Sequence, residues 1–478
     1  MGSKRKWKII AECVVTVGLT VLLLHCSAQL LEGSKSDEKY QSFFEQEEDF
    51  DVLFIGNSHM KYSVFPMELW NDYGIVSYNM AVEAQVLPAD YWQMKNVLDY
   101  TDPDLIVIDC YYLSETDKVY SHMHTAFDSI PLSRTKIDAI IDLLDGEKTD
   151  LTYLEFLWNY SLYHNRWNEL GEKDFGRRDE NTKGAGYIIE IATGNDMIKI
   201  PKEDKLQQDT RGVEYLEKMI EECQERGIEV LLTYLPFPAW EEAQKEANRV
   251  YDIAAEYGVE YINFLELDLI NYKTDCSDDQ HINLSGGRKV TEYLGQYIID
   301  HYDVADQRNN AAYENWHEDY RNYRDDMVNG LYSYTSLDYY LLYLYDKEYL
   351  TFIEINSPEI WSDYYADLFE NLGICKDNIG ENTDFLVVHN AGRHVDYLEN
   401  FQEYEGELVS EAGKIEIFTS ESGTYGVYLD GSELYVIESE QNSNPDIRIV
   451  VVDANTKEVL DQSSFYRKKD APRLYGKE

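Results

Sequence analysis

The sequence predicts two folded domains behind an N-terminal membrane anchor. The first is expected to be a flavodoxin-like, doubly wound α/β domain with a five-stranded parallel sheet. The second is expected to be β-rich, an α+β sandwich. Three observations support this. A basic and then apolar segment opens the chain, short apolar runs then alternate with amphipathic stretches, and later runs are separated by glycine and asparagine. The length of 478 residues also exceeds what a single core usually supports.

Residues 1–8 (MGSKRKWK) carry four lysines and arginines, and an apolar run follows from Ile9 to Leu24, interrupted by Glu12. Roughly 18–20 apolar residues span a bilayer, so the run is of marginal length. The basic flank predicts a cytoplasmic N-terminus with the rest of the chain outside. The competing hypothesis is a cleaved signal peptide, because 26–28 (CSA) resembles a small-residue cleavage site. We favour a single-pass cell-membrane anchor over 1–32, followed by a polar stalk over 33–47.

The predicted α/β domain covers residues 48–304. Buried strands are expected at 51–55, 75–79, 105–109, 228–235 and 260–264, with amphipathic helices at 89–98, 213–226, 240–257 and 287–300. Residues 113–205 form a long insertion, which we expect to be a partly helical cap. In a parallel sheet of this kind the active site lies at the carboxyl ends of the strands.

The C-terminal third of the chain has a different pattern. Residues 305–334 are polar with interspersed aromatics and predict a helical linker. Residues 335–470 predict the β-rich accessory domain, with strands at 350–355, 385–389, 414–418, 426–429, 433–437 and 447–452. One helix is expected near 361–371.

Composition excludes several classes of function. The chain has 91 acidic and 42 basic side chains, a net charge of −49, which repels nucleic acid. The six cysteines show neither a C-x-x-C pair nor metal-ligand spacing, so we expect no metal and no cofactor. The sequence leaves a single disulfide open.

A candidate nucleophile follows the first predicted strand, in the segment Gly56-Asn57-Ser58-His59. This position places the Ser58 hydroxyl at the carboxyl edge of the sheet, at the start of a helix whose free N–H groups can stabilise an oxyanion. A serine at such a position is also a common helix cap, so this motif alone does not establish catalysis.

A second motif, 278–283 (DDQHIN), follows the fifth strand. Asp278, three residues before His281, can orient the imidazole through one ring nitrogen while the other faces Ser58. A serine hydroxyl needs such a base to become nucleophilic. The alternative is a helix-capping or surface histidine. Two motifs predicted on one rim favour a Ser58–His281–Asp278 triad.

These motifs resemble those of the SGNH (GDSL-like) hydrolase superfamily. The segment 54–58 (FIGNS) is similar to its first block, 78–84 (YNMAVEA) to its second and 278–283 to its last. The resemblance covers about residues 48–303 and implies an oxyanion hole built from the backbone N–H groups of Ser58 and Ala84, where Ala84 replaces a glycine. Asn57 replaces the usual aspartate. The third block, Gly-x-Asn-Asp, is absent at 108–112 (IDCYY).

Membrane-anchored relatives without the third block resemble the teichoic acid D-alanyl transfer protein and the alginate and peptidoglycan O-acetyltransferases. The resemblance implies that Ser58 carries an acyl group to a glycan or polyol hydroxyl of a cell-envelope polysaccharide or teichoic acid-like polymer. A membrane-bound O-acyltransferase is the implied partner. The C-terminal domain weakly resembles interleukin-like (ILEI/PANDER) domains, which implies carbohydrate or partner binding. A purely structural spacer is an equal alternative.

Four further side chains are expected to contact substrate: Asn57, Tyr111, His164 and Arg166. Arginine and histidine beside aromatic residues suit a sugar or an anionic polymer. Ordinary packing in the cap explains His164 and Arg166 equally well. The sequence thus leaves two functions: an envelope serine esterase or O-acyltransferase, and a non-catalytic SGNH-like protein that binds envelope glycan or a partner.

Overall fold

The structure is a computed structural model of the 478-residue chain. It describes residues 2–32, 42–44, 46, 49–119, 122–157, 164–168, 170, 182–192, 196–357, 362–378, 385–390, 394–399, 406–410, 413–420, 424–438, 445–467 and 474–476. The predicted stalk (33–47) lies mostly outside these residues.

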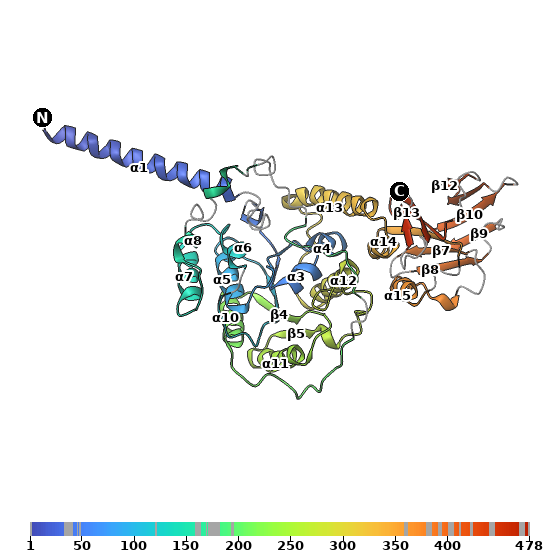
Figure 1. The fold of residues 1–478 in the computed structure, drawn as a ribbon, viewed down its shortest axis with the longest axis horizontal. Coiled ribbons are helices and arrows are strands. Elements are labelled where there is room, and N and C mark those ends of the chain that lie inside the picture. Colours follow the sequence, from blue (N-terminus) through green and yellow to red (C-terminus); the bar gives the residue numbers. More distant parts are fainter. Residues whose placement is uncertain are drawn as a thin grey trace.

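A single long helix, α1 (Gly2–Glu32), opens the chain and projects away from the folded domains (Figure 1). Its segment Lys6–Leu24 is long and apolar enough to cross a membrane, and none of it is buried against the rest of the chain. This agrees with the predicted anchor.

The first domain is built on a five-stranded sheet in the order β2-β1-β3-β4-β5, and every pair in it is parallel. This order is that of flavodoxin-like doubly wound sheets, as the sequence predicted. The strands are β1 (Val52–Ile55), β2 (Ser77–Asn79), β3 (Leu105–Asp109), β4 (Glu229–Tyr234) and β5 (Glu260–Asn263). All five predicted strands are therefore present.

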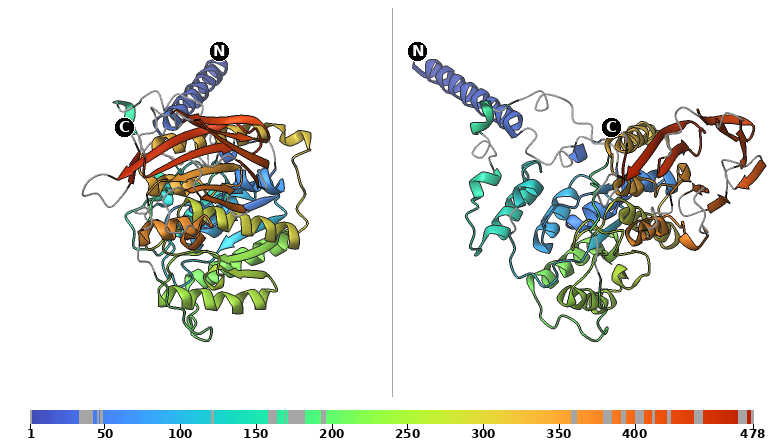
Figure 2. Two further views of the ribbon diagram at one scale, coloured as in Figure 1. Left: turned by 90° about the vertical axis from the view of Figure 1, so that its right-hand side faces the viewer. Right: turned by 45° about the vertical axis from the view of Figure 1, so that its right-hand side comes forward.

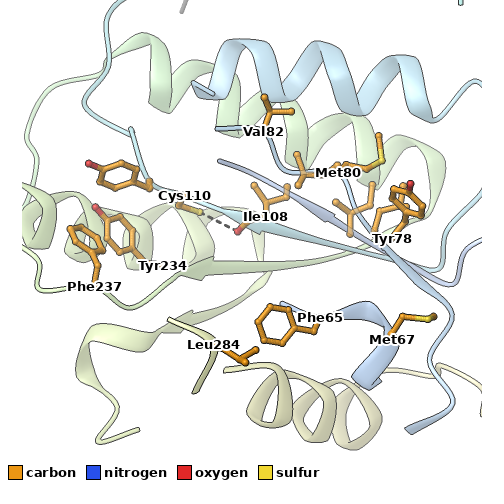
Figure 3. Close-up of a cluster of buried hydrophobic side chains, with 14 of the residues drawn as sticks. Phe65, Met67, Tyr78, Met80, Val82, Ile108, Cys110, Tyr234, Phe237 and Leu284 are labelled. Atoms are coloured by element: carbon orange, nitrogen blue, oxygen red, sulfur yellow. Dashed lines mark hydrogen bonds between the residues drawn. The ribbon is translucent and has the colours of Figure 1, made fainter. Parts of the chain in front are cut away.

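Helices cover both faces of this sheet because successive strand residues point to opposite sides. Leu53 and Ile55 belong to the larger buried cluster, with α5, α10 and α11, whereas Val52 and Phe54 pack with α4 and α12. Figure 3 shows part of the larger cluster. The helices are α3 (Ser58–Ser63), α4 (Pro66–Tyr73), α5 (Leu87–Val97), α10 (Arg211–Arg226), α11 (Glu241–Tyr257) and α12 (Leu284–His301), with the short η4 (Phe264–Glu266).

The insertion after β3 is partly helical in its described residues. It contains α6 (Met123–Phe127), α7 (Arg134–Leu144), α8 (Tyr153–Leu157) and η2 (His164–Asn168). Its last part returns to the sheet: the Asn79 N–H donates to the Lys183 carbonyl (2.9 Å), and the Leu284 N–H donates to that of Ile188 (3.0 Å). These bonds place residues 182–192 beside the carboxyl ends of the strands.

A helical segment joins the two domains. It comprises η5 (Ala311–Tyr313), α13 (Glu314–Ser333) and α14 (Leu337–Tyr343). Arg288 of α12 fixes this junction: its guanidinium donates to Glu68 (2.8 Å) and to the Tyr345 carbonyl (2.9 Å), and lies 2.7 Å from Asp346. The Arg288 side chain is 4% exposed, so this ion pair is buried and depends on its geometry being complete.

The second domain packs two antiparallel sheets face to face (Figure 2). One has the order β15-β14-β13-β6-β7-β8 and the other β12-β11-β10-β9, with a buried apolar layer between them. The elements are β6 (Tyr349–Ile355), α15 (Asp363–Asn371), η7 (Lys376–Asn378), β7 (Phe385–Asn390), β8 (His394–Glu399), β9 (Gly406–Ser410), β10 (Gly413–Thr419), β11 (Tyr425–Leu429), β12 (Ser432–Ile437), β13 (Ile447–Asp453), β14 (Val459–Arg467) and β15 (Leu474–Gly476).

The β-rich prediction for this domain is confirmed, but the predicted strands do not include four that the structure contains, β14, β8, β9 and β15. The last three are sheet-edge strands. An edge strand needs less apolar surface than a central one, and β8 (HVDYLE) is accordingly only partly buried. The sequence left one disulfide open. In the structure all six cysteines are free thiols.

Candidate active site

Ser58 is the first residue of α3, directly beyond the carboxyl end of β1. The connection requires Gly56: its φ is +155°, and a Cβ there would lie 2.9 Å from the Asp109 Cβ. Asn57 then caps the helix, because its side-chain oxygen accepts from the His59 N–H (2.9 Å). The strand end, the glycine and the cap together fix the position of the Ser58 hydroxyl.

His281 and Asp278 lie on one tight loop between η4 and α12. The Asp278 carboxylate accepts from the backbone N–H groups of Gln280 and His281, both at 2.7 Å. Beneath this turn, the Ser277 N–H donates to the His281 carbonyl (2.9 Å), and Cys276 pairs with Ile282 as an antiparallel bridge. The loop is therefore a closed, hydrogen-bonded hairpin.

The structure brings the three predicted residues into one hydrogen-bonded chain. His281 Nε2 lies 2.9 Å from Ser58 Oγ, and His281 Nδ1 lies 2.9 Å from Asp278 Oδ2. An ionised carboxylate only accepts hydrogen bonds, so Nδ1 carries the proton of the neutral ring, Nε2 accepts, and Ser58 donates. This is the arrangement in which a histidine can remove the proton of a serine hydroxyl.

The Asp278 carboxyl is held in its charged form. Burial acts to raise its pKa, but the hydrogen bond from His281 and the N–H of Gln280 outweigh burial, and the net pKa lies below the ordinary value. An ionised Asp278 stabilises the imidazolium that forms when His281 takes the proton from Ser58.

The predicted oxyanion donors lie on two segments beside Ser58. The N–H of Ser58 is in the first turn of α3, where backbone donors have no partner within the helix. Ala84 follows β2 in a turn and has a φ of +54°, a left-handed conformation. The Val82 N–H donates to the Gly56 carbonyl (3.0 Å), which ties this turn to the nucleophile segment. The glycine of the resemblance would adopt the Ala84 conformation without strain.

Asp109 stands near where the third block of the resemblance would lie. It ends β3, is fully buried, and accepts from the Leu235 N–H (3.1 Å), which joins the ends of β3 and β4. Burial raises its pKa to about 7, and nearby Glu246 adds to the rise. This carboxyl acts as a structural acceptor at the sheet edge.

His59 is a site residue to which the sequence reasoning gave no role. Its buried ring lies between Tyr111 (4.3 Å between ring centroids) and Phe237 (4.5 Å), and 5.9 Å from the His281 ring. Burial, and secondarily His281, lowers the pKa of His59 to about 3, so it is neutral at working pH. A neutral aromatic wall therefore stands behind His281.

A mostly buried aromatic cluster runs outward from His59 over the ends of β3 and β4 to the exposed Trp240. Tyr111 contacts Tyr112 (4.3 Å) and Phe237 (5.4 Å), and Phe237 contacts Trp240 (5.5 Å). Trp240 is 44% exposed. Phe237 and Trp240 were missed by the sequence reasoning, although their position after a strand (236–240, PFPAW) at the carboxyl edge could have indicated them.

The four predicted substrate contacts are dispersed. Asn57 is buried as the helix cap, and Tyr111 is buried against His59. Arg166 donates to the Leu31 carbonyl at the end of α1 and is not brought to the triad. The side chain of His164 lies outside the described residues. Among the side chains that the structure describes here, Asn57 adjoins Ser58 and Tyr111 contacts His59, and substrate contact by any of the four remains a prediction.

Comparisons with known proteins give little beyond this geometry. No family model and no curated protein matches the chain. Among solved structures, an inferred acylhydrolase from Bacteroides fragilis is similar at 14% identity and a TM-score of 0.29, covering 54% of this chain and 93% of its own. An inferred lipolytic protein of the G-D-S-L family from Desulfitobacterium hafniense is similar at 13% identity and a TM-score of 0.27, covering 51% and 97%. At these TM-scores the likeness carries no argument about function.

The raised pKa of Asp109 gives a prediction for stability. Its folded pKa, about 7, exceeds the ordinary value of 3.8, so the folded chain binds this proton more tightly and stability falls as pH rises between these values. Asp109→Asn keeps the acceptor for Leu235 and cannot ionise. We expect the variant to gain unfolding free energy over wild type on going from about pH 5 to about pH 8, by up to about 3 kcal/mol.

Chemical denaturation of the two proteins at both pH values measures this gain. Asp102→Asn serves as the control, because Asp102 is an exposed aspartate in the turn before β3. An Asp109→Asn effect that is the same at both pH values would contradict a carboxyl that ionises late.

Proposed function

We propose that this protein is a membrane-anchored serine esterase or O-acyltransferase that acts on acyl esters of cell-envelope glycans or polyols. The observation that carries the proposal is the hydrogen-bonded chain from Ser58 through His281 to the ionised Asp278. A serine in this arrangement is activated for acyl chemistry, and few structural roles require all three groups in line.

In the proposed reaction, Ser58 Oγ attacks the carbonyl carbon of an acyl ester while its proton passes to His281 Nε2. The N–H groups of Ser58 and Ala84 stabilise the resulting oxyanion. Collapse of this intermediate expels the alcohol, which takes the proton from His281, and leaves the acyl group on Ser58. A second hydroxyl, from water or a sugar, then gives its proton to His281 and attacks, and Ser58 regains its proton when the new ester or acid leaves.

The anchor supports a site of action at the cell membrane. Four basic residues precede the apolar segment of α1, which favours a cytoplasmic N-terminus and an extracytoplasmic enzyme. Acyl groups would reach such an enzyme through a membrane-bound O-acyltransferase partner. The acidic surface, with a net charge of −49, would not attract nucleic acid.

The exposed Trp240 ring at the outer end of the aromatic cluster supports a sugar hydroxyl, rather than water, as the acyl acceptor. Sugar rings stack on exposed aromatic faces, and Trp240 offers a ring held by Phe237 and Tyr111 on the rim that carries Ser58. A rigid ring loses little conformational entropy when a sugar binds. The C-terminal domain is proposed as an accessory module for carbohydrate or a partner.

Covalent labelling by a fluorophosphonate probe tests the activated serine. We expect the wild-type chain to be labelled, Ser58→Ala not to be labelled, and Asp278→Asn to react about a thousandfold more slowly because His281 loses its orienting acceptor. Asp279→Asn is the matched control, since Asp279 is the exposed neighbour of Asp278. Folded wild-type protein that is not labelled would favour the non-catalytic glycan- or partner-binding function instead.

The role of Trp240 is tested by measuring how the acyl group is divided between water and a sugar acceptor. With a p-nitrophenyl acetate donor and a soluble oligosaccharide acceptor, we expect Trp240→Ala to raise the KM for the acceptor about fivefold, because a stacking contact of about 1 kcal/mol is lost. Release of p-nitrophenol in water alone should stay unchanged. Tyr153→Ala, an exposed aromatic on α8, is the control. An unaltered acceptor KM would exclude Trp240 from the acceptor site.

A further inference from the structure

A buried carboxylate, Asp275, lies beneath the loop that carries His281 and Asp278. Its side chain is fully buried. Oδ2 accepts from the Asn271 N–H (2.9 Å) and from Lys289 Nζ (2.7 Å), while Oδ1 accepts from the Ser285 hydroxyl (2.8 Å). A buried charge with this many donors holds its surroundings in one geometry, since each lost partner leaves it partly unsatisfied.

The backbone of Asp275 joins the two ends of the same loop. Its N–H donates to the Asn271 carbonyl (2.8 Å), and its carbonyl accepts from the Asn283 N–H (2.8 Å). The segment between these bonds includes both Asp278 and His281. Any shift of Asp275 therefore moves the loop on which the base and its orienting acid stand.

The remaining partner of Asp275 comes from the second domain. Asn371, the last residue of α15, donates from Nδ2 to Asp275 Oδ1 (2.9 Å) and to Ser285 Oγ (3.2 Å), and its Oδ1 accepts from Lys289 Nζ. The side chain at position 371 must donate a hydrogen bond to Asp275 and accept one from Lys289. An amide supplies both, whereas a carboxylate or an amine supplies one.

Asn371 is held firmly in place by its own domain. Phe369 and Leu372, on either side of it in sequence, are buried in the large apolar cluster that includes the face of β6 and β13 turned away from the second sheet. The hydroxyl of Tyr364, on the same helix, donates to Asp338 of α14 (2.8 Å). The amide is thus presented to Asp275 by a rigid helix end rather than by a loop.

We propose that the C-terminal domain is part of the active centre, because Asn371 acts as a positioning residue for the loop that carries His281 and Asp278. The catalytic consequence rests on the proposed function. The structural consequence does not: the order of the 271–283 loop depends on a side chain about 90 residues further along the chain, in the other domain.

Hydrogen exchange on the full-length protein in detergent tests the structural part. In Asn371→Ala we expect the amides of 275–283 to exchange about tenfold faster than in wild type, since a hydrogen bond to a buried charge is lost. Asn371→Asp should act the same way, because it keeps the shape and the acceptor for Lys289 but removes the donor for Asp275. Glu370→Gln, at the exposed neighbouring position, should leave the loop unchanged.

The outcomes separate this inference from the proposed function. Faster loop exchange, with β13 still protected, supports the inference whether or not Ser58 reacts. Where wild type turns over p-nitrophenyl acetate, Asn371→Ala should lower kcat about tenfold and leave KM unchanged, because the loop and not the substrate is displaced. Unchanged loop exchange in both Asn371 variants would overturn the inference.

Discussion

The hydrogen bond between Ser58 Oγ and His281 Nε2 joins groups that are 223 residues apart in the chain. It can form because both segments leave the sheet at the same edge. Ser58 follows β1, and the His281 loop follows β5 and η4, while the parallel order β2-β1-β3-β4-β5 aligns every strand end on one rim. Helices cover both faces of that sheet and bury its side chains, so the strand ends on this rim have fixed positions.

Several local features fix the backbone and the side chains around Ser58. Gly56 lets the chain pass within contact distance of Asp109, and Ala84 accepts a left-handed conformation in the turn beside Ser58. Both are backbone conformations that most residues avoid, and surrounding hydrogen bonds hold them. His59 adds a neutral, aromatic wall. The site is thus rigid before any substrate arrives, which is the condition under which fixed N–H dipoles stabilise an oxyanion best.

The junction between the domains contacts the loop that carries His281. Arg288 of α12 is buried against Glu68 and Asp346. The next residue, Lys289, pairs with the Asp275 carboxylate, to which Asn371 also donates. The beginning of α12 thus meets both the base-bearing loop and the second domain. Burying charged groups costs free energy of desolvation. A C-terminal domain joined to the first domain only by a flexible linker would have no reason to bury charges where the two domains meet.

The sequence predicted the central sheet and the three hydrogen-bonded residues because both leave local signals. Buried parallel strands are continuous apolar runs, and Asp278 and His281 sit at a spacing that closes one turn. The role of His59 and of Asn371 could not be predicted in this way. Each depends on a neighbour that is distant in sequence, Phe237 for the first and Asp275 for the second. Arg166 shows the reverse, since its guanidinium donates instead to the Leu31 carbonyl at the end of α1.

The most direct test of an activated Ser58 is to trap the acyl-enzyme. The full-length protein would be mixed with p-nitrophenyl acetate, quenched in acid and analysed by peptide mass spectrometry, in parallel with His281→Ala. We expect an acetyl group at Ser58 in the wild-type protein and none at Ser58 in the variant. Acetylation at other residues only, or equal acetylation of Ser58 in both proteins, would contradict an activated serine at this site.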